Sequence, residues 1–313
     1  MEEETHTIRC LLCKEIQDAF VQLVKTISKI SPDLRWIWRT NTFEMKATTL
    51  KSTAFLEYLF KPVSFKEFNG PSEDNIIFVN SKRVLSACTM FDKAESVEMV
   101  LQQTKLIFNI VINQNTSISR TIQLDEQEES MDREPTYQNH AQVKGSALVF
   151  CSAFSSFPRD TEFISILINE NQVEFHSYNK TKLNEKRINS HVIATADKFE
   201  GIKFPTPNGI GDVAKVTVQF KDYKHIMNLA KVLSTSPNLR VKSVEDEGYI
   251  DFNYFNYISI RFTMAGLIEE DDTTTQTTSG TTTTNTNDHQ RRRYVEDEPV
   301  SEVSISNITR SMV

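Results

Sequence analysis

Lysine is the residue type whose spacing in this 313-residue chain suggests a function, because the sequence lacks the usual residue patterns for catalysis or metal binding. The CxxC pair Cys10 and Cys13 lacks a second pair or a His partner, and residues three apart on a strand face opposite sides. None of the six His has H-x-H or H-E-x-x-H spacing. The G-x-G-x-x-A run at Gly209 precedes a strand instead of opening a helix. We therefore expect no catalytic residue, no metal site and no cofactor.

Eight lysines recur on the polar faces of three segments with helical spacing, residues 14–30, 81–93 and 221–236. They are Lys14, Lys25, Lys29, Lys82, Lys93, Lys221, Lys224 and Lys231. Lysines along exposed faces, with no interleaved aromatic residues, favour contact with phosphates over base readout or base stacking. For any single helix, an ordinary solvated surface is the alternative. The recurrence in three helices favours an anionic partner.

The net charge of −7 is unevenly distributed along the chain. The acidic stretch from Asp125 to Glu134 carries −5 and the last 48 residues carry another −5, which leaves the rest at +3. The Thr-rich end has few large apolar residues, so we predict a disordered tail over residues 267–313. An acidic connector is expected at residues 125–139, between domains at 1–124 and 140–266.

Targeting and redox features are sparse. No apolar window is long enough to span a membrane, and the acidic N-terminus does not resemble a signal peptide. An intracellular protein that does not enter the membrane is therefore expected, with its four cysteines as buried thiols. The tribasic run at residues 291–293 is a weak signal for nuclear import.

Strand patterns dominate both predicted domains. Residues 43–48, 214–220 and 257–264 alternate between apolar and polar side chains, as in a sheet with one buried face. The first helix has an apolar stripe that includes Phe20 and Ile27, and a weaker helix at 145–157 has Leu148, Cys151 and Phe154. "SPDLR" and "SPNLR" each follow a helix and precede a strand. Aligned in order, the segments form four βαβββ units, two in each domain.

Four such units, divided by an acidic connector and bearing lysine-rich helices, resemble the DNA sliding clamps of the PCNA type. The stretch "RWIWRTNTFEMKATTLKSTAFLEYLFKPVSFKEF" is similar to the tail-bearing subunit of the nine-one-one DNA-damage checkpoint clamp. The resemblance covers about residues 5–266. It implies an α+β fold with antiparallel sheets outside and helices inside a ring around double-stranded DNA. The eight lysines would then face the DNA without regard to its sequence.

The resemblance also implies a non-catalytic role in the nucleus. Such a subunit joins two other clamp subunits in a heterotrimer, is loaded by a clamp loader and recruits checkpoint and repair factors. Its phosphorylated tail binds a BRCT-repeat adaptor. The candidate phosphorylation sites in this tail are Ser301, Ser304 and Thr309.

Two other functions compete with this interpretation. A replicative clamp that works as a homotrimer has the same repeated units, although the tail argues against it. A metal-dependent nuclease would use Glu126, Glu128 and Glu129 as metal ligands. That acidic stretch lies in a predicted connector without a rigid frame, which makes the nuclease the more distant alternative.

Overall fold

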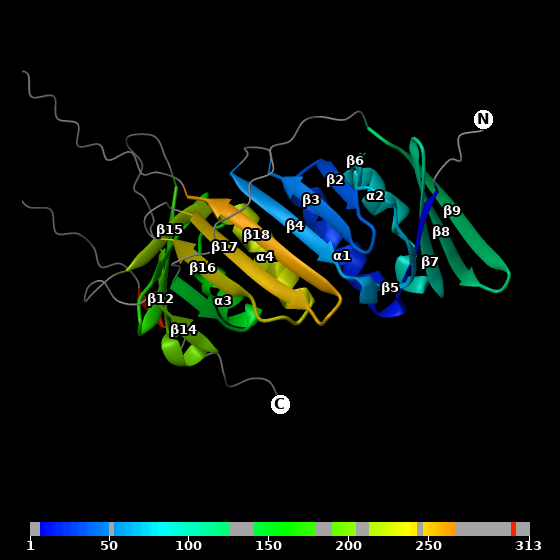
Figure 1. The fold of residues 1–313 in the computed structure, drawn as a ribbon. Coiled ribbons are helices and arrows are strands. Elements are labelled where there is room, and N and C mark those ends of the chain that lie inside the picture. Colours follow the sequence, from blue (N-terminus) through cyan, green and yellow to red (C-terminus); the bar gives the residue numbers. More distant parts are fainter. Residues whose placement is uncertain are drawn as a thin grey trace, which may run out of the picture.

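The computed structural model describes residues 7–49, 53–125, 141–179, 190–204, 213–242, 247–266 and 302–304. These residues form three sheets and four α-helices (Figure 1). The helices are α1 (Lys14–Ile30), α2 (Ser81–Ala87), α3 (Ala147–Ala153) and α4 (Phe220–Val232). Short 3-10 turns occur at η1 (Pro62–Ser64), η2 (Phe91–Lys93), η3 (Phe154–Ser156) and η4 (Ala196–Lys198). The fold is the expected α+β combination of antiparallel sheets with few helices.

The first half of the chain consists of two βαβββ units that exchange their first strands. The N-terminal sheet has the order β5 (Phe65–Asn69), β1 (Ile8–Leu12), β7 (Ser96–Gln102), β8 (Lys105–Asn113) and β9 (Thr116–Gln123). Its neighbour contains β4 (Ala54–Phe60), β3 (Phe43–Thr48), β2 (Asp33–Trp38) and β6 (Asn75–Asn80). Strand β1 thus pairs with the second unit and β6 with the first. The exchange makes the two units one cooperative domain.

The second half repeats this exchange. Strands β14 (Gly201–Lys203), β10 (Ala141–Lys144), β16 (Asn238–Lys242), β17 (Glu247–Tyr254) and β18 (Ile258–Ala265) pair in that order. The C-terminal sheet has the order β15 (Ala214–Gln219), β11 (Phe163–Ile168), β12 (Gln172–Tyr178), β13 (Ser190–Thr195) and β19 (Glu302–Ser304). Strand β10 joins the fourth unit and β15 the third. Both halves therefore have the same topology, as four repeated units require.

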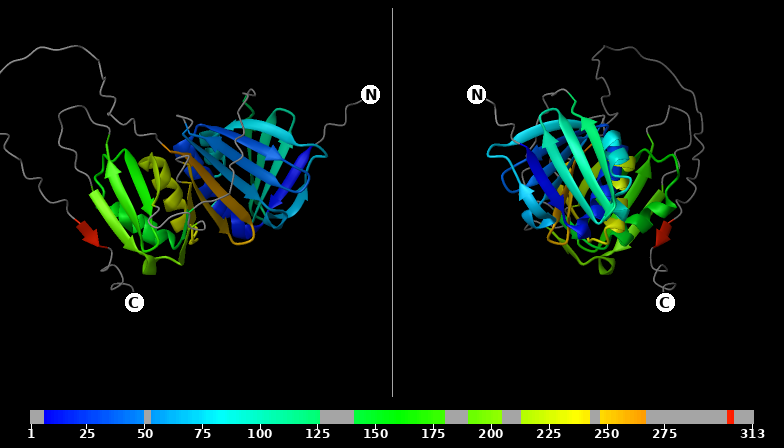
Figure 2. Two further views of the ribbon diagram at one scale, coloured as in Figure 1. Left: turned by 60° about the vertical axis from the view of Figure 1, so that its left-hand side comes forward. Right: turned by 90° about the vertical axis from the view of Figure 1, so that its right-hand side faces the viewer.

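One ladder joins the halves into a single body. Strands β4 and β18 pair antiparallel over seven residues, from Ile258–Phe60 to Met264–Ala54, and create a continuous nine-stranded central sheet. Behind this sheet the helices contact one another in the order α2, α1, α4, α3. Figure 2 shows the helices gathered on one side of the strands. The molecule thus has a strand face and a helix face.

Aromatic side chains fill the core between these faces. Phe20 of α1 packs against Trp36, Phe60 and Phe91, with ring centroids 5.7–6.3 Å apart. In the second half, Phe154 packs against Phe175 and Phe220. The predicted apolar stripe of α1 is buried along its length, and the alternating residues Phe43, Met45 and Ala47 of β3 point inward. These patterns identified the core face of both elements.

The shorter helices differ from the sequence prediction. Instead of continuing over residues 81–93, α2 ends at Ala87, and η2 then buries Phe91 against Phe20 and Phe108. Lys82 and Lys93 therefore belong to two helices. In α3 the predicted stripe is wrong at Leu148, which is 54% exposed. The buried face is formed by Ala147, Phe150 and Ala153.

Three strands were not predicted. Strands β5 and β14 occupy equivalent places, each pairing with the first strand of its half. In the predicted tail, β19 pairs parallel to β13. The rest of the tail lies outside the described residues, as does the connector apart from Asp125, which bridges to Phe78. The proposed domain bounds remain predictions.

The cysteines are free thiols, of which Cys10 and Cys88 are buried and Cys13 and Cys151 partly exposed. Cys10 lies on β1, whereas Cys13 precedes α1 as its N-cap. In the part of the chain that the structure describes, no helix combines the length and apolarity that crossing a bilayer requires.

Candidate nucleic-acid interface

The helix face presents the predicted lysines. All eight side chains are exposed. Lys25 and Lys29 lie one turn apart on α1, opposite its buried stripe, while Lys221, Lys224 and Lys231 lie on α4. The two helices contact each other directly. Amphipathic folding of both segments therefore brings lysines from opposite ends of the sequence to one surface.

The pKa of a histidine on α4, His225, indicates that the lysines of the two helices lie close together. His225 of α4 is partly buried, and burial is the main reason that its pKa lies below the ordinary value. The positive charges of Lys29, Lys221 and Lys224 lower the pKa further. Lys29 comes from α1, so the two lysine groups are close enough to share one electrostatic field. We call Lys25, Lys29, Lys221, Lys224 and Lys231 the lysine cluster.

The cluster extends toward α3. Burial raises the pKa of the Cys151 thiol on that helix, while the charges of Lys231 and Lys224 oppose the rise. Helix α3 itself contributes no lysine. Lys224 also lies over the ring of Phe220, 5.2 Å from its centroid, which holds the ammonium group beside the helix start.

The other three predicted lysines lie at two places. Lys82 is at the start of α2, beside the end of α1, because the neighbouring Ser81 donates to the carbonyls of Ser31 and Pro32. Lys14 and Lys93 are at the other end of α1. The Lys14 ammonium donates to the Gln17 side chain and to the carbonyl of Ala94, next to Lys93. Lys14 and Lys29 are separated by fifteen residues of helix, or about 22 Å. The exposed acids Glu15 and Asp18 accompany Lys14, so the first half of α1 carries a net charge of −1. Positive charge is concentrated on the second half of α1, on α4 and at the start of α2.

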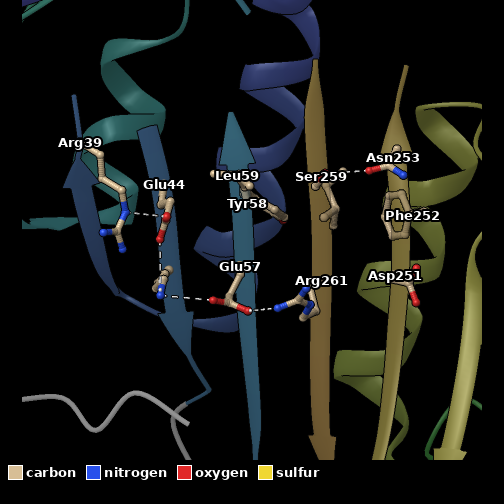
Figure 3. Close-up of a pocket in the computed structure, with 12 residues that line it drawn as sticks. Arg39, Glu44, Glu57, Tyr58, Leu59, Asp251, Phe252, Asn253, Ser259 and Arg261 are labelled. Carbon is tan, nitrogen blue, oxygen red and sulfur yellow. Dashed lines mark hydrogen bonds and ion pairs between the residues drawn. The ribbon is translucent and has the colours of Figure 1, made fainter. Parts of the chain in front are cut away.

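The strand face has a different electrostatic character. Figure 3 shows charged side chains forming a chain of ion pairs that starts at Arg39, just after β2, and crosses β3, β4 and β18. Glu44 pairs with both Arg39 and Lys46, at 2.9 and 3.4 Å. Glu57 pairs with both Lys46 and Arg261, at 3.3 and 3.4 Å. These residues line a hollow of about 350 Å³ whose charges are already neutralised within the protein.

By contrast, the lysines of the helix face have no such neutralisation. Among the described residues, none of the eight predicted lysines makes an ion pair of 4 Å or shorter. An approaching anion lowers the electrostatic free energy of an ammonium group that has no ion-pair partner, whereas a paired ammonium group must first lose its partner. The helix face therefore carries positive charge that no carboxylate of the described residues neutralises within 4 Å.

The sequence prediction missed one cluster of polar residues. Glu174 and His176 on β12 and His191 on β13 place three potential metal ligands within 4.8 Å of one another. The E-x-H spacing on a strand was the available signal, because residues two apart share a face. The third member depends on the pairing of β12 with β13.

Comparison with known proteins identifies the fold. Crystal structures of Proliferating Cellular Nuclear Antigen from Entamoeba histolytica and of PCNA from Thermococcus kodakaraensis superpose with TM-scores of 0.67 and 0.66. Sequence identities are 12% and 10%, and each match covers 83% of this chain and 99% or 100% of the other. The likeness extends over nearly all of both relatives. It establishes the PCNA-like clamp fold.

The family is established separately, from the sequence. A search of curated protein sequences gave no match. The model of the Rad9 family, however, matches residues 20–267, which include most of α1 and every later element up to β18. Four repeated units, a helix face with unpaired lysines and this match lead to one conclusion. The chain belongs to the Rad9 family and is a clamp of the PCNA-like fold.

Proposed function

We propose that this chain is the tail-bearing subunit of a heterotrimeric DNA-damage checkpoint clamp in the nucleus. It surrounds duplex DNA together with two other clamp subunits, is placed there by a clamp loader, and recruits checkpoint and repair factors. Its role is that of a scaffold without catalysis. The observation that carries the proposal is the contrast between unpaired lysines on the helix face and paired charges on the strand face.

The lysine cluster suits loose contact with a moving duplex. Each ammonium group can neutralise a phosphate without reading a base, so affinity follows the phosphate backbone and falls steeply with salt. Lysine is a flexible point charge and adapts as the phosphates move. Several weak contacts spread over α1 and α4 permit sliding, whereas a few strong ones would hold the DNA in one register.

The ends of the outer sheets support assembly into a ring. In the described residues, β9 is an edge strand of the N-terminal sheet, and at the far edge of the C-terminal sheet the three residues of β19 cover only part of β13. An edge strand presents backbone donors and acceptors that another chain can pair with. Two different edges at opposite ends of one subunit favour head-to-tail contacts, and a closed set of such contacts forms a ring.

The tail supplies the recruiting element of this proposal. Ser301 and Ser304 lie in acidic surroundings, and Thr309 follows them. A phosphate there adds about −1.5 to −2 charges and three acceptor oxygens, which suits a basic pocket of a BRCT-repeat adaptor. Ser301 and Thr309 lie outside the described residues, while Ser304 is the last residue of β19.

Assembly tests the proposal against the homotrimer. The chain expressed alone should have the solution mass of one copy, and co-expression with two other clamp subunits should give a complex with one copy of each. A stable trimer of this chain alone would establish the replicative alternative. A chain that stays monomeric in the presence of both partners would refute the checkpoint proposal.

The lysine cluster has its own test. Replacing Lys25, Lys29, Lys224 and Lys231 with Gln in the assembled clamp should weaken duplex binding and flatten its salt dependence, by about 0.9 in slope per lost phosphate contact. The matched control replaces four exposed strand lysines, Lys66, Lys105, Lys144 and Lys203, with the same loss of charge. Equal effects of the two sets on the salt slope would show that the helix face is not the DNA surface.

A further inference from the structure

The outward face of the C-terminal sheet contains two histidines and a carboxylate in ligand geometry. Glu174 and His176 lie two residues apart on β12, while Val173 and Phe175 between and beside them are buried. His191 is the direct partner of His176 across the β12–β13 ladder. All three side chains are partly exposed, at 21%, 40% and 24%. The ladder thus brings one carboxylate and two imidazoles to a single accessible spot.

The distances fit a small metal ion. One carboxylate oxygen of Glu174, Oε2, lies 3.1 Å from Nε2 of His176 and 3.1 Å from Nε2 of His191. The two imidazole rings are 4.2 Å apart between centroids. Ligand atoms around a tetrahedral zinc ion, each about 2.0–2.1 Å from the metal, are about 3.3 Å from one another. The two carboxylate–imidazole distances already match this spacing.

The cluster is supported by the residues around it. Gln172 Nε2 donates to the second oxygen of Glu174, Oε1, at 2.7 Å and fixes the carboxylate. Behind the strands, Phe175 packs between the rings of Phe150 and Phe154.

We propose that Glu174, His176 and His191 bind a divalent transition-metal ion of the zinc type. Two imidazole nitrogens and one carboxylate oxygen suit Zn²⁺ and disfavour Mg²⁺ and Ca²⁺, which take oxygen ligands. Each ring binds through Nε2 and keeps its proton on Nδ1. Three protein ligands leave a fourth position open toward solvent. The ion links β12 to β13 and stiffens this end of the sheet.

Metal titration tests the site in the full, untagged chain after treatment with a chelator. Zinc alone, followed by calorimetry, should bind saturably at one site per chain. The variant Glu174→Gln/His176→Asn/His191→Asn should bind zinc at least about tenfold more weakly. His225→Asn is the matched control, because His225 lies on α4 among lysines, and it should leave zinc affinity unchanged.

A second measurement does not depend on the folding of the variant. In the unaltered chain, zinc should shift the NMR signals of the His176 and His191 rings together and leave those of His225 in place. Zinc binding that is equally tight in the triple variant would assign it to other residues, such as His6, His140 or His289. No saturable binding, or no shift of the two rings, would reduce the cluster to a carboxylate hydrogen-bonded by two histidines.

Discussion

At the scale of single residues, buried hydroxyl groups differ in how they affect the free energy of unfolding. The hydroxyls of Ser165 and Thr217 are buried and lie 2.6 Å apart on paired strands. The hydroxyl of Tyr223 is fully buried without a hydrogen-bond partner. A buried polar group without a partner costs about 1–3 kcal/mol, whereas a paired one is close to neutral. The two sites therefore respond oppositely to the loss of one oxygen.

We predict that Thr217→Val lowers the free energy of unfolding by about 1–3 kcal/mol, because Ser165 is left unpaired. Tyr223→Phe should leave this free energy unchanged or raise it by up to about 1 kcal/mol. Urea denaturation measures both, through a shift of the midpoint at constant slope. A loss of more than about 1 kcal/mol in Tyr223→Phe would reveal that its hydroxyl has a partner in solution.

His225 provides a pH prediction for the lysine cluster. Its pKa in the folded chain lies below the ordinary 6.5, chiefly through burial and then through Lys29, Lys221 and Lys224. Between the lowered value and 6.5 the unfolded chain binds more protons, so stability rises with pH across this window. The contribution is fully present above 6.5 and is lost as the pH falls through the folded value.

We predict that Lys29→Gln moves the pKa of His225 up toward 6.5 and that duplex DNA moves it in the same direction. The first change removes a positive charge, and the second adds a negative field. NMR titration of the His225 ring measures both, with Lys66→Gln on β5 as a control that should have no effect. A pKa unaffected by DNA would place the duplex away from α4.

At the scale of elements, long periodic segments could be predicted and short ones could not. The seventeen residues of α1 contain enough turns for the buried stripe to define one face. Helix α3 has seven residues, and its stripe was shifted because Phe150 packs on Phe175 and Phe199. Only its tertiary neighbours select Phe150 over Leu148. The same limit applies to His191, whose place opposite His176 is set by strand register and by no local pattern.

Strand β19 leads to a prediction about the edge of the C-terminal sheet. Its three residues pair with His191, Val192 and Ile193, and so cover part of β13. Deleting residues 267–313 should speed hydrogen exchange of the β13 amides, because they lose their pairing with β19. Exchange of the β11 amides should stay unchanged, because β11 lies inside the sheet and three paired residues add little to the stability of the whole fold. Mass spectrometry of the two chains measures this. Unchanged exchange in β13 would show that β19 does not cover this edge in solution.

At the scale of the whole molecule, the repeated units could be predicted but their exchange of strands could not. Each unit gives its first strand to the sheet of the other, as β1 does with β7 and β10 with β16. No unit can then fold without its partner. The halves, in turn, share the β4–β18 ladder and the contact of α1 with α4. Such sharing predicts that the described fold unfolds as one cooperative body.

The last prediction tests whether the β4–β18 ladder couples the two halves. Both tryptophans of the chain, Trp36 and Trp38, lie on β2, so their fluorescence follows the first half while circular dichroism follows the whole. In the unaltered chain the two urea transitions should coincide. Arg261→Pro removes a backbone donor from β18, which is paired on both sides, and it should destabilise the second half selectively. Circular dichroism should then change at lower urea than fluorescence. Arg261→Ala, which loses the charged side chain and its ion pair with Glu57 but keeps the backbone donor, should keep the transitions together. If they also coincide in Arg261→Pro, at a lower midpoint, the halves are coupled through α1 and α4 instead of through the ladder.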